Sequence, residues 1–159
     1  MNKIESLVLR KAHASEASEI ASISRLHVEY GLNWRWTPAR VKRHIKDKDT
    51  IVLVASMRGV LHGFAIMKFG DDTAHLLLLA VQPKVRRIGV GTALHHWLEK
   101  SARTAGIQQV RLEVRASNQS AKKFYESLGY RLVGQLAAYY DRRETAVVMG
   151  RVLDEAVSK

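Results

Sequence analysis

A short segment after an apolar stretch combines two glycines with two arginines, a combination that suits phosphate binding. Arg86 and Arg87 come just before Gly89 and Gly91. Glycine has no Cβ, so the backbone can pass close to a ligand. The segment leads into an amphipathic stretch, and the free N–H groups of a helix's first turn attract anions. Because arginine adds charge-assisted hydrogen bonds, we expect the segment to bind a diphosphate.

Two common phosphate-binding motifs do not match this segment. The dinucleotide-binding fingerprint needs a third glycine where Leu94 stands, and the P-loop needs a Gly-Lys-Ser/Thr sequence that the chain lacks. An ordinary strand-to-helix turn with solvated arginines would contain the same glycines. The segment alone leaves that alternative open.

The elements that must position the segment alternate between strand and helix periodicity. The predicted strands are 7–10, 51–55, 61–69, 74–81, 110–114, 131–134 and 145–153. The predicted helices are 15–30, 37–46, 90–105 and 118–128. Strand 74–81 is nearly all apolar, so we expect it to be buried on both faces. An antiparallel meander followed by strand–helix–strand–helix–strand predicts an α+β domain built in α/β layers.

Length and composition favour one globular domain over residues 1–159, with 47% apolar and 26% charged residues. The absence of cysteine excludes a disulfide scaffold, Cys-ligated zinc and a thiol nucleophile. The longest apolar run, 76–81, is too short for a membrane helix, and the N-terminus lacks a signal-peptide core. We therefore expect a cytoplasmic protein without a membrane partner. Its net charge of +11 suits RNA, a polyphosphate cofactor or solubility alone.

Two motifs together resemble a known family. The pattern RxxGxG at 86–91, after a strand ending in LAV at 79–81, resembles the acetyl-CoA loop of the GCN5-related N-acetyltransferases (GNAT). Residues 112–130 (LEVRASNQSAKKFYESLGY) resemble the family's second half, and are most similar to ribosomal-protein and other protein N-terminal acetyltransferases. The resemblance implies a GNAT-like, mixed, mostly antiparallel central sheet of about seven strands with about four helices. Its fourth and fifth strands, 74–81 and 110–115, would splay apart.

The resemblance also implies a site for acetyl-CoA and no metal. Backbone groups of Leu79 and Val81 would bind the pantetheine arm, with the N–H of Val81 facing the thioester oxygen. Asn118 would hydrogen-bond to the pantetheine region, and Tyr125 would lie near the sulfur. The residues expected around the diphosphate are Arg86, Arg87, Ile88, Gly89, Val90, Gly91 and Thr92.

Acetyl transfer to an amine requires a group that takes the amine proton and a group that protonates the departing thiolate. Tyr125 is the candidate acid, because a phenol with a pKa near 10 matches a thiolate, although the same position fits a core side chain. Glu113 is the candidate base, and its alternative role is an ion pair with Arg111 or Arg115. An α-amine needs less help from a base than a lysine does, which favours an N-terminal acceptor.

The acceptor side is less clearly marked. Trp34-Arg35-Trp36 could form an acceptor wall or plug the core, and Tyr139-Tyr140 would line the opposite side by resemblance. Segment 31–49 does not match the ribosomal-protein enzymes, so the acceptor stays open. A small amine such as a polyamine or an antibiotic would need acidic residues, for which the candidates are Glu29, Asp71 and Asp72.

A third hypothesis is a non-catalytic, basic RNA- or ribosome-binding module with the same fold. The interleaved basic and aromatic residues of a single-strand binder are missing, so we do not expect a nucleic-acid partner. The expected partners are acetyl-CoA and an amine acceptor, and a homodimer is compatible with the sequence. Adjacent His95 and His96 point about 100° apart on a helix, so we expect solvated side chains and no shared metal.

Overall fold

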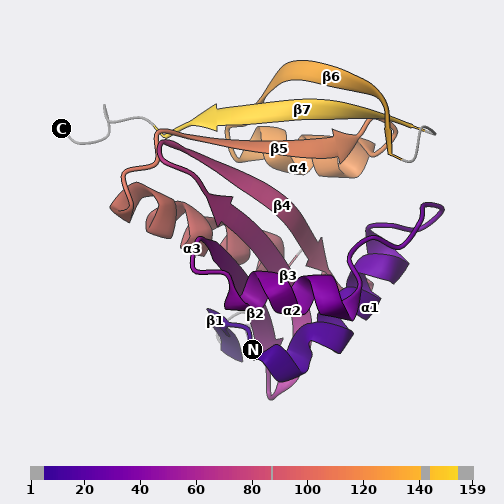
Figure 1. Ribbon diagram of the computed structural model, residues 1–159, viewed down its shortest axis with the longest axis vertical. Helices are drawn as coiled ribbons and strands as arrows, with labels where there is room; N and C mark the ends of the chain where they lie inside the picture. Colours follow the sequence, from indigo (N-terminus) through magenta and orange to yellow (C-terminus); the bar gives the residue numbers. More distant parts are fainter. Residues whose placement is uncertain (1–5, 87, 141–143, 154–159) are drawn as a thin grey trace.

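The computed structural model describes residues 6–86, 88–140 and 144–153, which form a seven-stranded sheet with helices on both faces (Figure 1). The strand order is β1-β2-β3-β4-β5-β7-β6, and only the β4–β5 pair is parallel. The strands are β1 (Leu7–Lys11), β2 (Thr50–Met57), β3 (Val60–Phe69), β4 (Thr73–Val81), β5 (Gln109–Arg115), β6 (Arg131–Tyr140) and β7 (Glu144–Val152). The helices are α1 (Ala17–His27), α2 (Pro38–Lys46), α3 (Val90–Thr104) and α4 (Gln119–Ser127), with 3-10 turns η2 (Ala14–Glu16) and η3 (Pro83–Val85). The expected α+β, GNAT-like architecture is confirmed.

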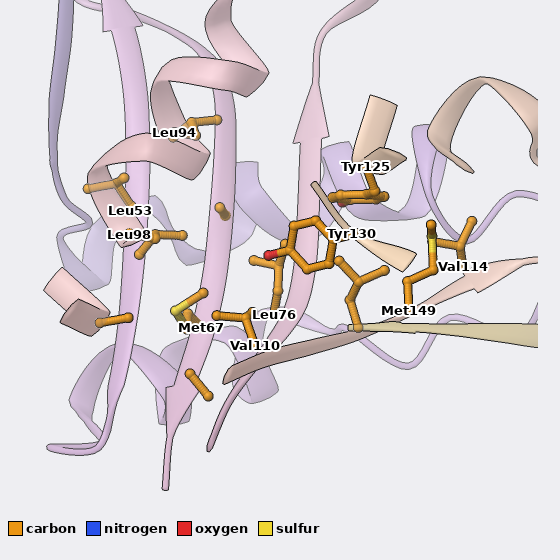
Figure 2. Packing of buried hydrophobic residues seen from close by; sticks show 14 of the residues in the cluster. Leu53, Met67, Leu76, Leu94, Leu98, Val110, Val114, Tyr125, Tyr130 and Met149 are labelled. Carbon is orange, nitrogen blue, oxygen red and sulfur yellow. The ribbon is translucent and has the colours of Figure 1, made fainter. Parts of the chain in front are cut away.

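Each face of the sheet has its own apolar cluster. Ile20 of α1 and Val41 of α2 pack with Phe64 of β3 on one face. On the other, Leu94 and Leu98 of α3 pack with residues of α4 and β5, as Figure 2 shows. Burying one such side chain contributes about 1.5–3 kcal/mol, so the two helical layers are fixed against the sheet independently.

An irregularity in β4 exchanges the faces of its side chains. Met67 of β3 pairs with Leu76 and the neighbouring Ile66 pairs with Leu78, which leaves Leu77 as an extra residue in β4. Leu76 therefore belongs to the α3–α4 cluster, whereas Leu78 belongs to the α1–α2 cluster. As predicted, β4 packs into the apolar clusters on both faces of the sheet, although fully buried residues alternate with half-buried ones along the strand.

The strands β4 and β5 are paired only at their start. Three residue pairs join them, from Thr73↔Gln109 to His75↔Arg111. Beyond that point β5 continues its ladder with β7, and β4 continues with β3. Figure 1 shows the two strands diverging from their shared end. The expected splay between the fourth and fifth strands is confirmed, and it leaves one edge of β4 unpaired.

Side-chain caps mark the starts of α2 and α4. Thr37 Oγ1 accepts a hydrogen bond from the N–H of Arg40 at 3.3 Å, and Pro38 occupies the first turn of α2. Asn118 Oδ1 accepts from the N–H of Ala121 at 3.0 Å and starts α4. The first helix is shorter than predicted, because residues 14–16 form the 3-10 turn η2. The strand β6 runs to Tyr140 rather than Gly134, because it continues to pair with β7.

Candidate functional site

The turn between β4 and α3 presents a row of backbone N–H groups without partners among the described residues. Gly89 adopts a left-handed conformation, with φ of +94°, and α3 begins at the next residue. Within the described part of the chain, none of the following residues donates its N–H to a hydrogen bond: Ile88, Gly89, Val90, Gly91 and Thr92. These donors stand at the positive end of the 15-residue helix α3, an arrangement that suits an anion. Arg87 lies outside the described residues.

Arg86 has a structural partner in addition to its predicted role. Its Nε donates a hydrogen bond to the backbone oxygen of Val81 at 2.9 Å. This bond ties the turn back to the end of β4 and fixes the distance between the strand end and the N-terminus of α3. The predicted contact with a diphosphate therefore rests on the remaining guanidinium nitrogens of an exposed side chain.

The free edge of β4 carries backbone groups beside that turn. The N–H of Gln82 donates to the oxygen of His62 in β3 at 2.8 Å. Hydrogen-bonding direction alternates along a strand, so the backbone groups of Leu79 and Val81 point away from β3, toward the side from which β5 has departed. These two residues were predicted to hold an extended ligand, and their backbone geometry allows it.

Gly91 brings the first turn of α3 close to α4, and Asn118 caps α4. A Cβ added to Gly91 would lie 3.2 Å from Cζ of Phe124 and 3.7 Å from a methyl group of Leu79, so the position requires glycine for this close approach. The Oδ1 atom of Asn118 is occupied as the cap of α4. Its amide nitrogen has no hydrogen-bond partner among the described residues and keeps the donor that the prediction needs.

Tyr125 lies within the α3–α4 cluster, with 7% of its surface exposed. Its ring makes edge contacts with Phe124 and Tyr130 at centroid distances of 5.1 and 5.5 Å, and Figure 2 shows the two tyrosines side by side. Burial raises the pKa of Tyr125 above its usual value, so the phenol stays protonated. The hydroxyl is therefore a weaker acid than a free phenol, and the expected match to a thiolate near 10 does not hold for the protein alone.

Glu113 meets a residue that the sequence did not single out. Its carboxylate accepts a hydrogen bond from Nε2 of His75 at 2.7 Å, where β4 and β5 part. The alternative ion pairs for Glu113 are not formed: Arg115 pairs with Glu144 at 3.0 Å, and Arg111 contacts Gln109. The His75 side chain is 40% exposed and that of Glu113 is 18% exposed, so the pair can exchange protons with water.

A buried carboxylate shapes the loop between α1 and α2. Glu29 accepts a hydrogen bond from Ser24 at 2.7 Å, and it also accepts the backbone N–H groups of Arg35 at 2.7 Å and Trp36 at 3.2 Å. Trp36 is buried in the α1–α2 cluster, and Trp34 Nε1 donates to the oxygen of Ala21. Residues 34–36 were predicted either to form a wall of the acceptor pocket or to fill the core. Both tryptophans pack into the core, and only Arg35 is exposed.

Tyr139 lies near the end of β6, with 46% of its surface exposed. Burial raises the pKa of the Tyr139 hydroxyl, and the charge of Glu113 raises it further, whereas Arg35 and Arg40 act in the opposite direction. Of Tyr140, only the backbone is described, as the last residue of β6.

His95 differs from its prediction. It is 1% exposed rather than solvated, and its Nε2 shares a hydrogen bond of 2.7 Å with the hydroxyl of Tyr130. Burial lowers the pKa of His95 to about 4. His96 is exposed as expected. The described residues contain no group of three or more His, Cys, Asp or Glu side chains arranged for a metal, and none of their helices is long and apolar enough to cross a membrane.

Comparison with known proteins identifies the family. Residues 22–139 match the family described as "Acetyltransferase (GNAT) domain". The chain therefore belongs to the GNAT family. It is 38% identical over 97 residues to the [ribosomal protein bS18]-alanine N-acetyltransferase of Escherichia coli, covering 59% of this chain and 66% of that protein. It is 36% identical over 97 residues to an uncharacterized N-acetyltransferase of Methanocaldococcus jannaschii, covering 60% and 62%.

The matched segments thus span slightly less than two thirds of those GNAT relatives. A solved structure, Ard1 from Thermoplasma volcanium, superposes with a TM-score of 0.84 and 27% identity over 94% of this chain and 99% of that chain. The resemblance drawn from the two motifs is confirmed at the level of family and fold. What the motifs did not indicate is the partner of Glu113, because His75 stands in a different strand.

Proposed function

We propose that this chain is an acetyl-CoA-dependent N-acetyltransferase that acetylates a primary amine, with a protein N-terminus as the acceptor. The observation that carries the proposal is the row of N–H groups from Ile88 to Thr92, which have no hydrogen-bond partner among the described residues and lie beside the free edge of β4. A family of acetyltransferases shares this fold, and relatives named as N-terminal acetyltransferases support the acceptor class. A cytoplasmic location and a homodimer stay predictions.

Backbone groups would hold the acetyl donor. The N–H row at the start of α3 binds the diphosphate, and Leu79 and Val81 bind the extended arm along the free edge of β4. When bound, acetyl-CoA supplies the thioester. A backbone N–H aimed at a developing oxyanion contributes a few kcal/mol, and Val81 is placed for that role at the end of β4.

Side chains would move the protons. Glu113 accepts the proton of the attacking amine directly or through a water, and His75 passes it on to solvent. The amine nitrogen forms a bond to the acyl carbon as the carbon–sulfur bond breaks. Tyr125 donates the proton that the departing sulfur needs.

The charge distribution disfavours a small polycationic acceptor. Of the acidic residues considered for such a pocket, Glu29 is occupied by Ser24 and two backbone amides. Asp71 and Asp72 precede β4 at the end where β4 and β5 are still paired, away from the splay. None of these three residues therefore offers a polyamine a free carboxylate at the splay.

A direct test combines binding and turnover. We expect isothermal titration to detect acetyl-CoA binding, and a thiol-release assay to give higher kcat/KM for peptides with a free α-amine than for lysine peptides or small amines. Peptides with a blocked N-terminus serve as the matched control. Binding of acetyl-CoA without turnover of any amine would contradict the proposed reaction, and RNA binding alone would favour the non-catalytic alternative.

A further inference from the structure

Arg115, the last residue of β5, contacts the loop between α1 and α2. Its Nη1 donates hydrogen bonds to the backbone oxygens of Tyr30 at 2.9 Å and of Val28 at 3.5 Å. Its guanidinium also lies over the ring of Tyr30, 4.5 Å from the ring centroid. On another side, Nε donates to the carboxylate of Glu144, the first residue of β7, at 3.0 Å. One side chain thus joins the end of β5, the start of β7 and the α1–α2 loop.

The guanidinium of Arg115 is held from both sides. The Arg115 side chain is 14% exposed and that of Glu144 is 20% exposed. Glu144 also accepts hydrogen bonds from the hydroxyl of Ser117 and, at 3.1 Å, from its backbone N–H. The bond from the hydroxyl does most to lower the pKa of Glu144, so the carboxylate stays charged beside Arg115. Only the planar fork of an arginine directs its donors at a carboxylate and at backbone oxygens at once.

Arg115 points to the same face of the sheet as the candidate base. Along β5, Val110, Leu112 and Val114 belong to the α3–α4 cluster. Side chains alternate along a strand, so Glu113 and Arg115 point to the other face, on which α1 and α2 pack. Two residues of a strand span about 6.6 Å. The proposed donor site at the start of α3 belongs to the opposite layer, so an amine that approaches Glu113 from the α1–α2 face passes beside the loop that Arg115 holds.

The contact between Arg115 and the loop crosses the gap that the splay opens. Residues of α1 pack in one cluster with Leu78 and Ala80, near the end of β4. After the first three residue pairs, β4 and β5 are no longer bonded to each other. Arg115 therefore connects the layer beside β4 to β5 at the open end. Figure 1 shows the chain between α1 and α2 at the end of the molecule toward which β4 and β5 run.

The loop that Arg115 holds, residues 28–36, is also fixed from within. Glu29 stands between the two residues whose backbone oxygens bind Arg115. Its buried carboxylate accepts the backbone N–H groups of Arg35 at 2.7 Å and Trp36 at 3.2 Å. These bonds tie the two ends of the loop together. A shift at the Arg115 contact is therefore passed on to the rest of loop 28–36.

We propose that Arg115 is a positioning residue for the acceptor: it holds loop 28–36 across the open end of the splay and so fixes the wall past which the amine reaches Glu113. Arg115 acts through the loop and does not touch the reacting atoms. A wall that is fixed before binding spares the acceptor the cost of ordering it, so Arg115 should affect acceptor binding more than the chemical step. The inference rests on the proposed function, since it concerns the same site.

The test compares steady-state kinetics and acetyl-CoA titration for three variants. In Arg115→Gln we expect the KM for an α-amine peptide to rise about 10-fold, while kcat and acetyl-CoA affinity stay within about 2-fold. Arg115→Lys keeps a charge beside Glu144 but lacks the planar fork, so it should recover only part of the loss. Tyr30→Ala removes a ring that is 55% exposed, and should raise the KM about 3-fold with little effect on folding.

Arg10→Gln is the matched control. Arg10 also ties a strand to the helical layer, because it pairs with Glu16 at 2.7 Å, but it lies in β1 at the edge of the sheet, away from the splay. We expect its acceptor KM to equal that of the parent. Hydrogen–deuterium exchange gives a readout besides activity: loop 28–36 should exchange faster in Arg115→Gln than in the parent or in Arg10→Gln, while α3 exchanges at the parental rate.

The outcomes separate this inference from the proposed function. An unchanged acceptor KM in Arg115→Gln overturns the inference and leaves acetyl transfer intact, as does an equal rise in Arg10→Gln. A fall in acetyl-CoA affinity would assign Arg115 to the donor side, and unchanged exchange of loop 28–36 would show that Arg115 does not hold it; each result overturns the inference. If the parent binds acetyl-CoA but acetylates no amine, the proposed function is contradicted and the inference falls with it.

Discussion

The two sides of the splay between β4 and β5 are built in different ways. On the proposed cofactor side, the groups are backbone atoms at the end of β4 and at the start of α3, close together in the chain. On the proposed acceptor side, the groups are side chains from separate strands, His75 of β4 and Glu113 of β5. A site made of local backbone tolerates changes in the surrounding side chains, whereas a site made of distant side chains can change its specificity residue by residue. The predictions below test this division.

The largest effect is expected from closing the backbone site. Gly91→Val places a branched side chain where even a Cβ lies 3.2 Å from Phe124 and so displaces the first turn of α3. We expect acetyl-CoA affinity to fall by more than about 100-fold, a loss of roughly 3 kcal/mol, measured by isothermal titration. Gly134→Val is the control, because nothing lies within 4 Å of its Cβ position. Equal affinity in the two variants would mean that this turn does not hold the donor.

Removing the candidate acid should affect turnover more than binding. Tyr125→Phe keeps the ring and its edge contacts with Phe124 and Tyr130 and removes only the hydroxyl. We expect kcat to fall by about 100-fold while acetyl-CoA affinity changes little. Steady-state kinetics and titration on one preparation provide both values. If kcat stays at the parental level, Tyr125 is a core residue only.

The effect of removing the candidate base should depend on pH. Glu113→Gln keeps a hydrogen bond to His75 and removes the carboxylate. At pH 7 we expect kcat/KM to fall by about 10- to 100-fold. The loss should shrink above pH 8, where an α-amine is already neutral and needs no base.

The matched variant His75→Gln should show a smaller loss with the same pH dependence, because His75 acts through Glu113. The measurement is a pH profile of kcat/KM for the parent and both variants. A loss that stays constant with pH would assign the pair a structural role.

The same division explains what could be predicted from the sequence. Glycine spacing, helix-capping residues and strand-to-helix periodicity are local signals, and they correctly predicted a turn between β4 and α3 and the boundaries of α2. The splay of β4 from β5 followed instead from the resemblance to the family. The partner of Glu113 depends on which residue of β4 stands beside β5 in a parallel register. No local pattern encodes that register, so His75 was missed. The extra residue Leu77 moves the side chains that follow it in β4 to the opposite faces of the sheet, and simple alternation does not predict this shift.

His95 shows the same limit within one helix. Its periodicity left it beside the apolar stripe of α3, and only the position of Tyr130, 35 residues away, determines that it is buried. Glu99 lies near its other ring nitrogen, at 3.8 Å, and is itself paired with Arg103 and Arg151. The burial of the His95 imidazole thus involves Tyr130, which follows α4 in the chain.

The smallest effect is expected from His95, whose partner Tyr130 packs against Tyr125, and it should appear in stability rather than in activity. Burial lowers the pKa of His95 to about 4, below the usual 6.5, so between these values the unfolded chain binds a proton that the folded chain does not. Its contribution to stability is therefore complete above pH 6.5 and is lost as the pH falls toward 4. Between pH 6.5 and 5, before most carboxylates titrate, the free energy of unfolding should fall by about 2 kcal/mol.

The control is His95→Gln, which keeps a polar partner for Tyr130 but does not titrate. His44, whose pKa burial also lowers, is present in both proteins, so the difference between them isolates His95. Urea unfolding at several pH values should give a flatter profile for the variant, while its acetyl-CoA affinity stays at the parental level. If the free energy of unfolding depends on pH in the same way in both proteins, His95 is open to solvent in the folded state. The packing of α3 around His95 and Tyr130 would then be less rigid than the structure indicates.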